Sequence, residues 1–113
     1  MKRYVVLIAY EPSVWDDASP EQQDAWYGDH ARFDAFVAEH GRLRSTAPLE
    51  GTDLATTVHH AGDELVVTEG PFAETHEVVA GYYDVELPDL DVAIAGCALL
   101  PRPFSVEIRP VEV

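Results

Sequence analysis

Titratable side chains are concentrated between residues 69 and 77, where the chain reads Glu-Gly-Pro-Phe-Ala-Glu-Thr-His-Glu. Carboxylates that share a cleft push their pKa values apart, which leaves one as a proton donor and another as a proton acceptor. We therefore consider Glu69 a candidate catalytic residue, and Glu74 and His76 candidate substrate contacts. The alternative role is structural, because Glu69 and Glu74 could accept hydrogen bonds from backbone N–H groups and fix a turn at Gly70-Pro71.

His30 is the second focus of potential chemistry. Trp26 precedes it by four residues and Phe33 follows it by three, which places it within the apolar side of a predicted helix. Asp34, four residues further on, can reach its ring, and a histidine oriented by a carboxylate is a general acid–base arrangement. The same residues also allow a core-edge histidine that Asp34 or a backbone carbonyl satisfies. Burial lowers the pKa of such a ring and carboxylates raise it; we expect Asp34 or Glu69 to dominate.

Arg44 and Arg109 could hold an anionic group of a substrate, because guanidinium groups bind carboxylates and phosphates through paired hydrogen bonds. Arg109 shares one face of the last predicted strand with Glu107, so an ion pair between them is the structural alternative. Tyr82 and its neighbour Tyr83 supply aromatic side chains from a strand, and one of the two must face the helices. We take Tyr82 as a candidate substrate contact.

Metal and phosphate sites receive little support from the residue spacing. His59 and His60 are adjacent on a predicted strand and point to opposite faces, so they cannot bind one ion together. His30 and Asp34 could offer two ligands, with Glu69 as a third, but no Cys–His spacing typical of a zinc site is present. We expect neither a metal nor another cofactor.

Length and charge limit the classes of protein to consider. The 113 residues correspond to one domain, so we treat residues 1–113 as a single unit. The formal net charge of −14 argues against binding to nucleic acid or to an anionic membrane surface. Cys97 is the only cysteine, which fits a reducing compartment, and no apolar stretch is long enough to cross a bilayer. We expect a cytoplasmic protein with a small-molecule ligand.

The apolar patterning predicts an antiparallel sheet and two helices. A Ser19 cap followed by Pro20 and Gln22 indicates a helix start, and Gly41 its end. Glu11 to Ser19 reads as a loop. Residues 43–48 read as a short extended piece rich in turn formers. The predicted strands are 4–10, 54–59, 64–68, 78–87 and 104–111, and the second helix is 89–100, with Leu90, Ile94 and Cys97 inward. This order is typical of a ferredoxin-like α+β fold with both helices on one face of the sheet.

The first predicted strand is apolar on both faces. Val5, Leu7 and Ala9 form one set, and the residues at 4, 6, 8 and 10 form the other. The two helices can cover only one face, so the other face requires a second sheet, which must come from a second copy. We expect a homodimer in which Tyr4, Val6, Ile8 and Tyr10 form the interface.

Residues 69–77 resemble the Asp-Gly-Pro-Phe-Ala-Glu-Thr-Lys-Glu signature of the YCII-related, DGPF-type family. The resemblance extends over nearly the whole chain, through residues 65–68, 81–83, 88–91 and 106–111. It implies a dimeric α+β barrel, similar in shape to small isomerases, cofactor-free oxygenases and ligand sensors. In wider relatives a histidine early in the first helix is paired with an acidic residue near the motif loop, and His30 and Glu69 look like these positions. Glu69 replaces the family's Asp, and His76 a frequent Lys.

Two functions follow as hypotheses. The first is a cofactor-free enzyme that transfers a proton to or from a small organic substrate, with His30 as the base and Asp34 or Glu69 orienting it. The second is a ligand-binding or regulatory module without chemistry. Some genes of the family lie near genes for alternative sigma factors, which is compatible with a regulatory role.

Overall fold

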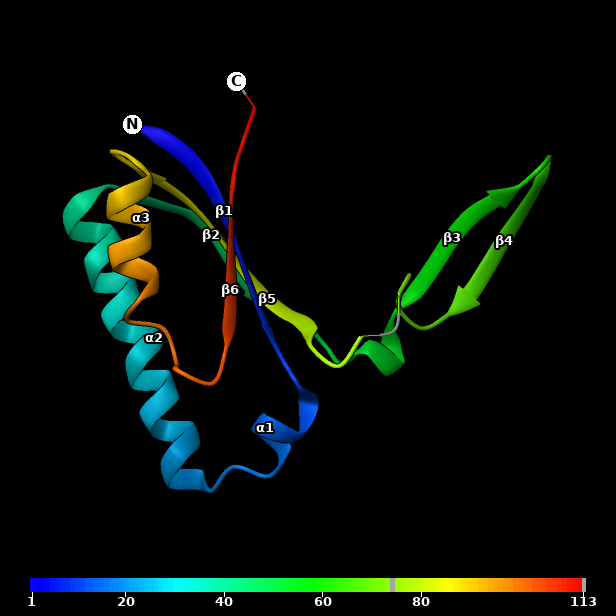
Figure 1. Cartoon of the computed structure of the whole chain (residues 1–113), viewed down its shortest axis with the longest axis horizontal. Helices are drawn as coiled ribbons and strands as arrows, with labels where there is room; N and C mark the ends of the chain where they lie inside the picture. The colour runs from blue at the N-terminus through cyan, green and yellow to red at the C-terminus, as the bar shows by residue number, and fades with distance from the viewer. Residues whose placement is uncertain (74, 113) are drawn as a thin grey trace.

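A computed structural model describes residues 1–73 and 75–112 of the chain. Helices α2 and α3 cover one face of a four-stranded antiparallel sheet of order β2-β5-β1-β6 and leave the other face open (Figure 1). The ferredoxin-like α+β fold expected from the order of elements is therefore confirmed. The elements of this body are β1 (Lys2–Tyr10), α1 (Pro12–Asp16), α2 (Pro20–His40), β2 (Arg42–Pro48), β5 (Val78–Leu87), α3 (Leu90–Cys97) and β6 (Ser105–Pro110).

Helix α2 begins and ends where the sequence predicts. The Ser19 hydroxyl accepts a hydrogen bond from the Gln22 backbone N–H, and the Gln22 side chain accepts one from the Ser19 N–H, each at 3.1 Å. At the other end, a Cβ atom on Gly41 would lie 1.9 Å from the Glu86 carbonyl oxygen. Glycine thus allows the chain to leave α2 directly against β5.

Helix α1 lies in the segment expected to be a loop, so that prediction was wrong. Pro12 occupies its first turn, where a missing N–H costs nothing. Trp15 then packs on α2, with its ring centroid 5.9 Å from that of Trp26 and 5.5 Å from that of Tyr27. These aromatic contacts hold a helix of only five residues in place.

The two faces of β1 are reversed relative to the prediction. Tyr4, Val6 and Ile8 are buried under the helices, where they join the core around Phe33. The open face instead carries Val5, Leu7 and Ala9, which are half-buried. Both sets are apolar, so the alternation alone could not show which one the helices cover.

Helix α3 turns only part of the expected side inward: Cys97 packs against the core as predicted. Leu90 and Ile94 are exposed, whereas Ala93 and Gly96 are buried. A Cβ atom on Gly96 would lie 2.8 Å from the ring of Phe36, so small residues let α3 approach α2 closely.

Two predicted strands form a separate sheet instead of joining the main one. A short 3-10 helix (Thr52–Leu54) leads into β3 (Thr56–Ala61), which pairs with β4 (Glu64–Glu69). We call the described residues between 49 and 77 the arm. It extends away from the body on the open-face side of the sheet (Figure 1). At its base, Gly70 adopts a φ of 101°, and its N–H donates to the Ala55 carbonyl at 2.7 Å.

Candidate functional site

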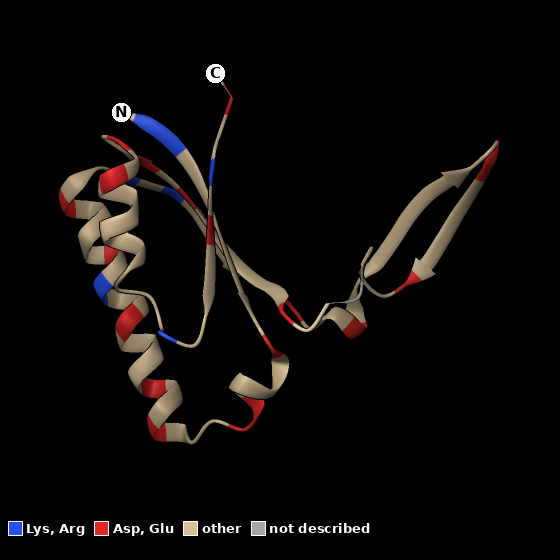
Figure 2. Cartoon of the chain, in the orientation of Figure 1, with Lys and Arg blue, Asp and Glu red and all other residues tan. Residues whose placement is uncertain are grey.

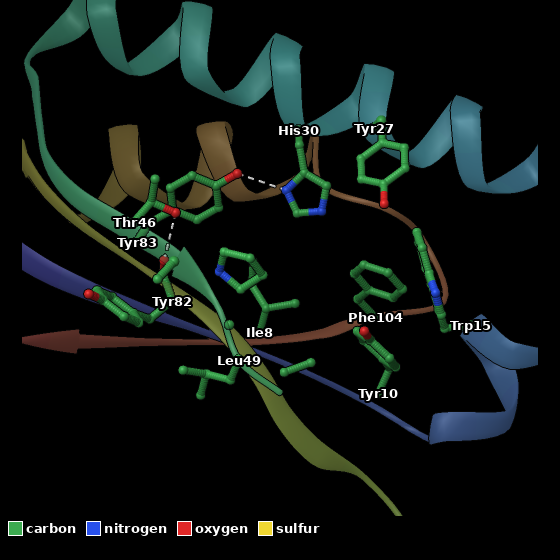
Figure 3. A pocket seen from close by; sticks show the side chains of 14 residues that line it. Ile8, Tyr10, Trp15, Tyr27, His30, Thr46, Leu49, Tyr82, Tyr83 and Phe104 are labelled. Carbon is green, nitrogen blue, oxygen red and sulfur yellow. Dashed lines mark hydrogen bonds between the residues drawn. The ribbon is translucent and has the colours of Figure 1, made fainter. Parts of the chain in front are cut away.

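A cavity of about 360 Å³ lies between α1, α2 and the end of the main sheet from which the arm departs. Its walls are largely aromatic (Figure 3). None of the described residues that line it is Asp, Glu, Lys or Arg. The lining side chains include Ile8, Tyr10, Trp15, Tyr27, His30, Thr46, Tyr83 and Phe104.

Several chain segments bring these rings together. Tyr10 at the end of β1 stacks on Phe104, which precedes β6, with ring centroids 4.5 Å apart. On α2, Tyr27 and His30 are three residues apart and therefore project from the same side of the helix. The floor is a bulge in β5, where the β1 register shifts between Ile8 and Ala9. Gly81 lies at this bulge, and a Cβ atom there would lie 3.1 Å from the Ala47 carbonyl oxygen.

His30 is fixed by a hydrogen bond across the core. Its Nδ1 atom lies 2.8 Å from the hydroxyl oxygen of Tyr83, which is buried on β5. The ring of Phe33 packs on Tyr83 with centroids 4.5 Å apart and holds the phenol in position. Figure 3 shows the imidazole projecting from α2 into the cavity with Nδ1 directed at Tyr83. No described residue forms a hydrogen bond with the second ring nitrogen, Nε2.

Burial dominates the proton affinities of both groups. The pKa of His30 is lowered, chiefly because its ring is removed from water, and the negative charges of Asp34 and Asp29 oppose this only in part. Our expectation that a carboxylate would outweigh burial was wrong. Burial also raises the pKa of Tyr83, and the Asp34 carboxylate near its hydroxyl adds to the effect. His30 is therefore a neutral base and Tyr83 a neutral phenol near neutral pH.

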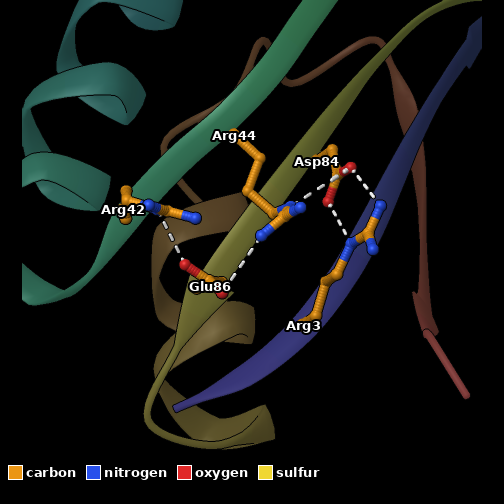
Figure 4. A network of polar contacts seen from close by, with 5 residues as sticks. All are labelled: Arg3, Arg42, Arg44, Asp84 and Glu86. Atoms are coloured by element: carbon orange, nitrogen blue, oxygen red, sulfur yellow. Dashed lines mark hydrogen bonds and ion pairs between the residues drawn. The ribbon is translucent and has the colours of Figure 1, made fainter. Parts of the chain in front are cut away.

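The two predicted arginines lie on the opposite face of the sheet. Arg44 contacts Glu86 at 3.3 Å and Asp84 at 3.8 Å within a cluster of charged residues (Figure 4). Arg109 pairs with Glu107 at 3.1 Å, as the structural alternative predicted. Strand alternation separates both arginines from His30, so an anion held by either would not lie in the cavity.

The motif loop is also distant from His30. Glu69 ends β4 in the arm, His76 is an exposed loop residue, and neither lines the cavity. Glu74 lies outside the described residues. The loop borders a second, apolar hollow of about 510 Å³ at the base of the arm, which Leu49, Leu54, Pro71 and Phe72 line. The structure thus pairs His30 with Tyr83 and Asp34, and not with Glu69.

Tyr82 borders the cavity, but its side chain points to the open face beside Leu7, away from His30 (Figure 3). Tyr83 takes the inward position. Sequence reasoning missed Tyr83, Tyr10, Trp15 and Phe104 as lining residues. A usable signal existed only for Tyr27, whose spacing of three residues from His30 puts the two on one side of a helix.

Three further observations concern metal ligands, membrane spans and the single thiol. Within the described residues, no group of three or more His, Cys, Asp or Glu side chains is arranged to hold a metal ion. Among the described helices, none combines the length and hydropathy needed to cross a membrane. The thiol of Cys97 packs against the core, and burial raises its pKa to about 11, so it is protonated near neutral pH.

Comparison with known proteins agrees with the sequence motif. The model of the YCII-related domain matches residues 2–113. An uncharacterized protein of Rhizobium meliloti (strain 1021) is 33% identical over 114 residues, which cover 97% of this chain and 92% of the relative. The match spans the body and the arm alike. The chain therefore belongs to the YCII-related domain family.

Proposed function

We propose that the cavity binds a compact, uncharged and planar organic molecule, and that His30 accepts a proton from it. The observation that carries this proposal is the 2.8 Å hydrogen bond between His30 Nδ1 and the Tyr83 hydroxyl, which aims the other nitrogen at the cavity. A base whose ring is held in one orientation loses less entropy when it reaches the transition state. The lowered pKa keeps this base unprotonated near neutral pH.

The residues in the walls of the cavity favour a planar and uncharged ligand. Aromatic side chains such as Trp15 and Phe104 offer faces and edges on which a planar ring can stack. A charged ligand would lose its hydration without meeting an opposite charge, because no charged side chain is among the described lining residues. The volume of about 360 Å³ suits a molecule of one or two rings.

In the proposed step, the Tyr83 hydroxyl donates to Asp34 and accepts a hydrogen bond from His30 Nδ1–H. The Nε2 lone pair then takes a proton from the ligand, and the new imidazolium charge is balanced by the Asp34 carboxylate through the phenol. Asp34 and Tyr83 act as positioning residues. A base of this strength suits an acidic C–H or O–H group, such as a phenol or a carbon next to a carbonyl.

Nitrobenzisoxazole allows a test that does not require the natural substrate. When a base removes its ring C–H proton, the N–O bond breaks and a coloured cyanonitrophenolate is formed. We expect the wild-type protein to accelerate this reaction, and His30→Gln to reduce the rate by about 100-fold or more. His40→Gln is the matched control, since His40 lies on the same helix and hydrogen-bonds the Phe36 carbonyl outside the cavity. Equal rates for wild type and His30→Gln would refute the role of His30.

Binding without chemistry is the second candidate, because a largely aromatic cavity with one basic side chain also suits a ligand sensor. Trp15 lines the cavity and Trp26 packs on Trp15, so intrinsic tryptophan fluorescence can report occupancy of the cavity. For an enzyme, His30→Gln should abolish turnover and leave the fluorescence-derived affinity for the probe nearly unchanged. For a sensor, the same variant should weaken affinity, and no turnover should be found in either protein.

A homodimer is the assembly that we propose. Val5, Leu7 and Ala9 form an apolar stripe on the open face, and Tyr82 extends it on the neighbouring strand. A second copy packed there would remove this stripe from water. Sedimentation should give a dimer for the wild type and a folded monomer for Leu7→Glu. A wild-type monomer at micromolar concentration would overturn the proposal.

A further inference from the structure

We infer that the arm of one copy docks on the arginine-bearing end of the partner's open sheet face. This inference rests on the proposed homodimer and adds its orientation. The two sheets face each other, and each strand of one copy runs antiparallel to the same strand of its partner. Each copy would then give an arm and receive one. The inference is independent of the chemistry of the His30 cavity.

The arm is an incomplete structure by itself. Its two strands pair with each other but make no extensive contact with any other described element. Val58 lies opposite Val67, and Leu65 projects from the same face of the hairpin. These three side chains remain 56–59% exposed. A lone two-stranded hairpin is marginally stable in water, so its apolar face needs a cover from outside the chain.

The arm is also strongly acidic. Seven Asp or Glu residues and no Lys or Arg occur between residues 49 and 77 of the sequence. Asp63 is at the hairpin turn, and Glu69 projects from the face that carries Val67. A surface that covers this arm must therefore offer apolar side chains together with positive charge.

The open face of the main sheet offers both. Four of the seven basic residues of the chain lie there, beside three carboxylates, although the chain as a whole carries −14. Arg42 and Arg109 remain 66% and 69% exposed even though each has a carboxylate partner. The charged groups on this face are Arg3, Arg42, Arg44, Asp84, Glu86, Glu107 and Arg109.

The register sets the orientation. Arg42 lies opposite Glu86, and Arg109 lies opposite Val5, so the arginines occupy one end of the sheet. The arm leaves after Pro48 and returns at Val78, at the other end (Figure 2). When equivalent strands of the two copies run antiparallel, each arm lies next to the partner's arginines. A parallel arrangement would bring the two acidic arms together, which electrostatic repulsion disfavours.

Charge reversal in separate copies tests this contact. One variant, Arg42→Glu with Arg109→Glu, reverses the sheet face; the other, Asp63→Lys with Glu69→Lys, reverses the arm. Each alone should dimerise about tenfold more weakly than the wild type, as measured by sedimentation. An equimolar mixture should recover wild-type affinity, because in the mixed dimer each arm meets a face of opposite charge.

Arg32→Glu with Arg102→Glu is the matched control. It makes the same change in charge at exposed positions on α2 and in the loop after α3, and it should dimerise as tightly as the wild type. A mixture that dimerises no more tightly than its components would overturn the inference, as would wild-type affinity in both reversed variants. A wild-type dimer in either of these cases would leave the homodimer proposal standing, whereas a wild-type monomer would refute both.

Discussion

The Nδ1 atom of His30 and the hydroxyl oxygen of Tyr83, 2.8 Å apart, join α2 to β5 across the edge of the core. Tyr83→Phe removes the hydroxyl and keeps the ring that packs on Phe33. We expect a loss of about 0.5–1.5 kcal/mol in the free energy of unfolding, measured by urea titration. We also expect a fall of about tenfold in the kcat for nitrobenzisoxazole with KM little changed, because the base is still present but is no longer oriented. An unchanged kcat would contradict the positioning role.

The lowered pKa of His30 predicts how stability depends on pH. The unfolded chain binds a proton near the ordinary histidine pKa of 6.5, whereas the buried ring in the folded chain binds it only at lower pH. The free energy of unfolding should therefore fall as the pH drops below about 6.5, and keep falling until the folded-state pKa is passed. His30→Gln should flatten this dependence, and His40→Gln should not. A steeper or unchanged slope in His30→Gln would show that burial does not control this pKa.

Asp84 should support stability in acid. Arg3 donates to both of its carboxylate oxygens, at 2.9 and 2.7 Å, and these hydrogen bonds lower the pKa of Asp84 below its ordinary value of 3.8. The stabilisation is thus complete above about pH 4 and is lost as the pH falls through the lower, folded-state pKa. Asp84→Asn should lower the Tm near neutral pH, and the difference from wild type should shrink in strong acid.

The exposed pair Arg109–Glu107 is the control for Asp84, because solvated ion pairs contribute little. Glu107→Gln should leave the Tm nearly unchanged at both pH values. Equal losses of Tm in the two variants would mean that the burial of Asp84 on the open face adds nothing to its ion pair.

Two glycines in and after α2 should respond to alanine in opposite ways. At Gly41 the new methyl group would collide with the Glu86 backbone, so Gly41→Ala should destabilise by about 1–3 kcal/mol or more. At Gly28 the nearest atom would be the tip of the Arg32 side chain at 3.9 Å, so Gly28→Ala should stabilise by about 0.5–1 kcal/mol. Thermal unfolding of both variants checks the pair. Stabilisation by alanine at Gly41 would contradict the close approach of α2 to β5.

Much of the fold could be predicted because local signals agree with it. The start of α2 is indicated by Ser19, Pro20 and Gln22, and its end by Gly41. The reversal of the β1 faces had a different cause: alternation separates two sets of residues but does not say which set is buried when both are apolar. A difference of this kind is decided by the neighbouring strands and helices, which a single segment does not contain.

The sequence predicted His30 as a site residue but not the residue that it contacts. His30 could be found because it is a titratable side chain among the apolar residues on one side of a helix. Its partner could not be found, because choosing Tyr83 over Tyr82 requires the register of β5 against β1. The position of Glu69 could not be found either, because residues 56–69 form a separate hairpin, which carries the motif loop away from α2 of the same chain.

The protonation of the His30 ring is the most direct test of the account, and nitrogen-15 NMR measures it without a substrate. The resonances can be assigned by their absence in His30→Gln. We predict a neutral ring near pH 7 with its proton on Nδ1, where it donates to the Tyr83 hydroxyl, and with the lone pair of Nε2 toward the cavity. A ring that is charged near pH 7, or a neutral ring with its proton on Nε2, would contradict the account, because neither presents a lone pair to a bound molecule.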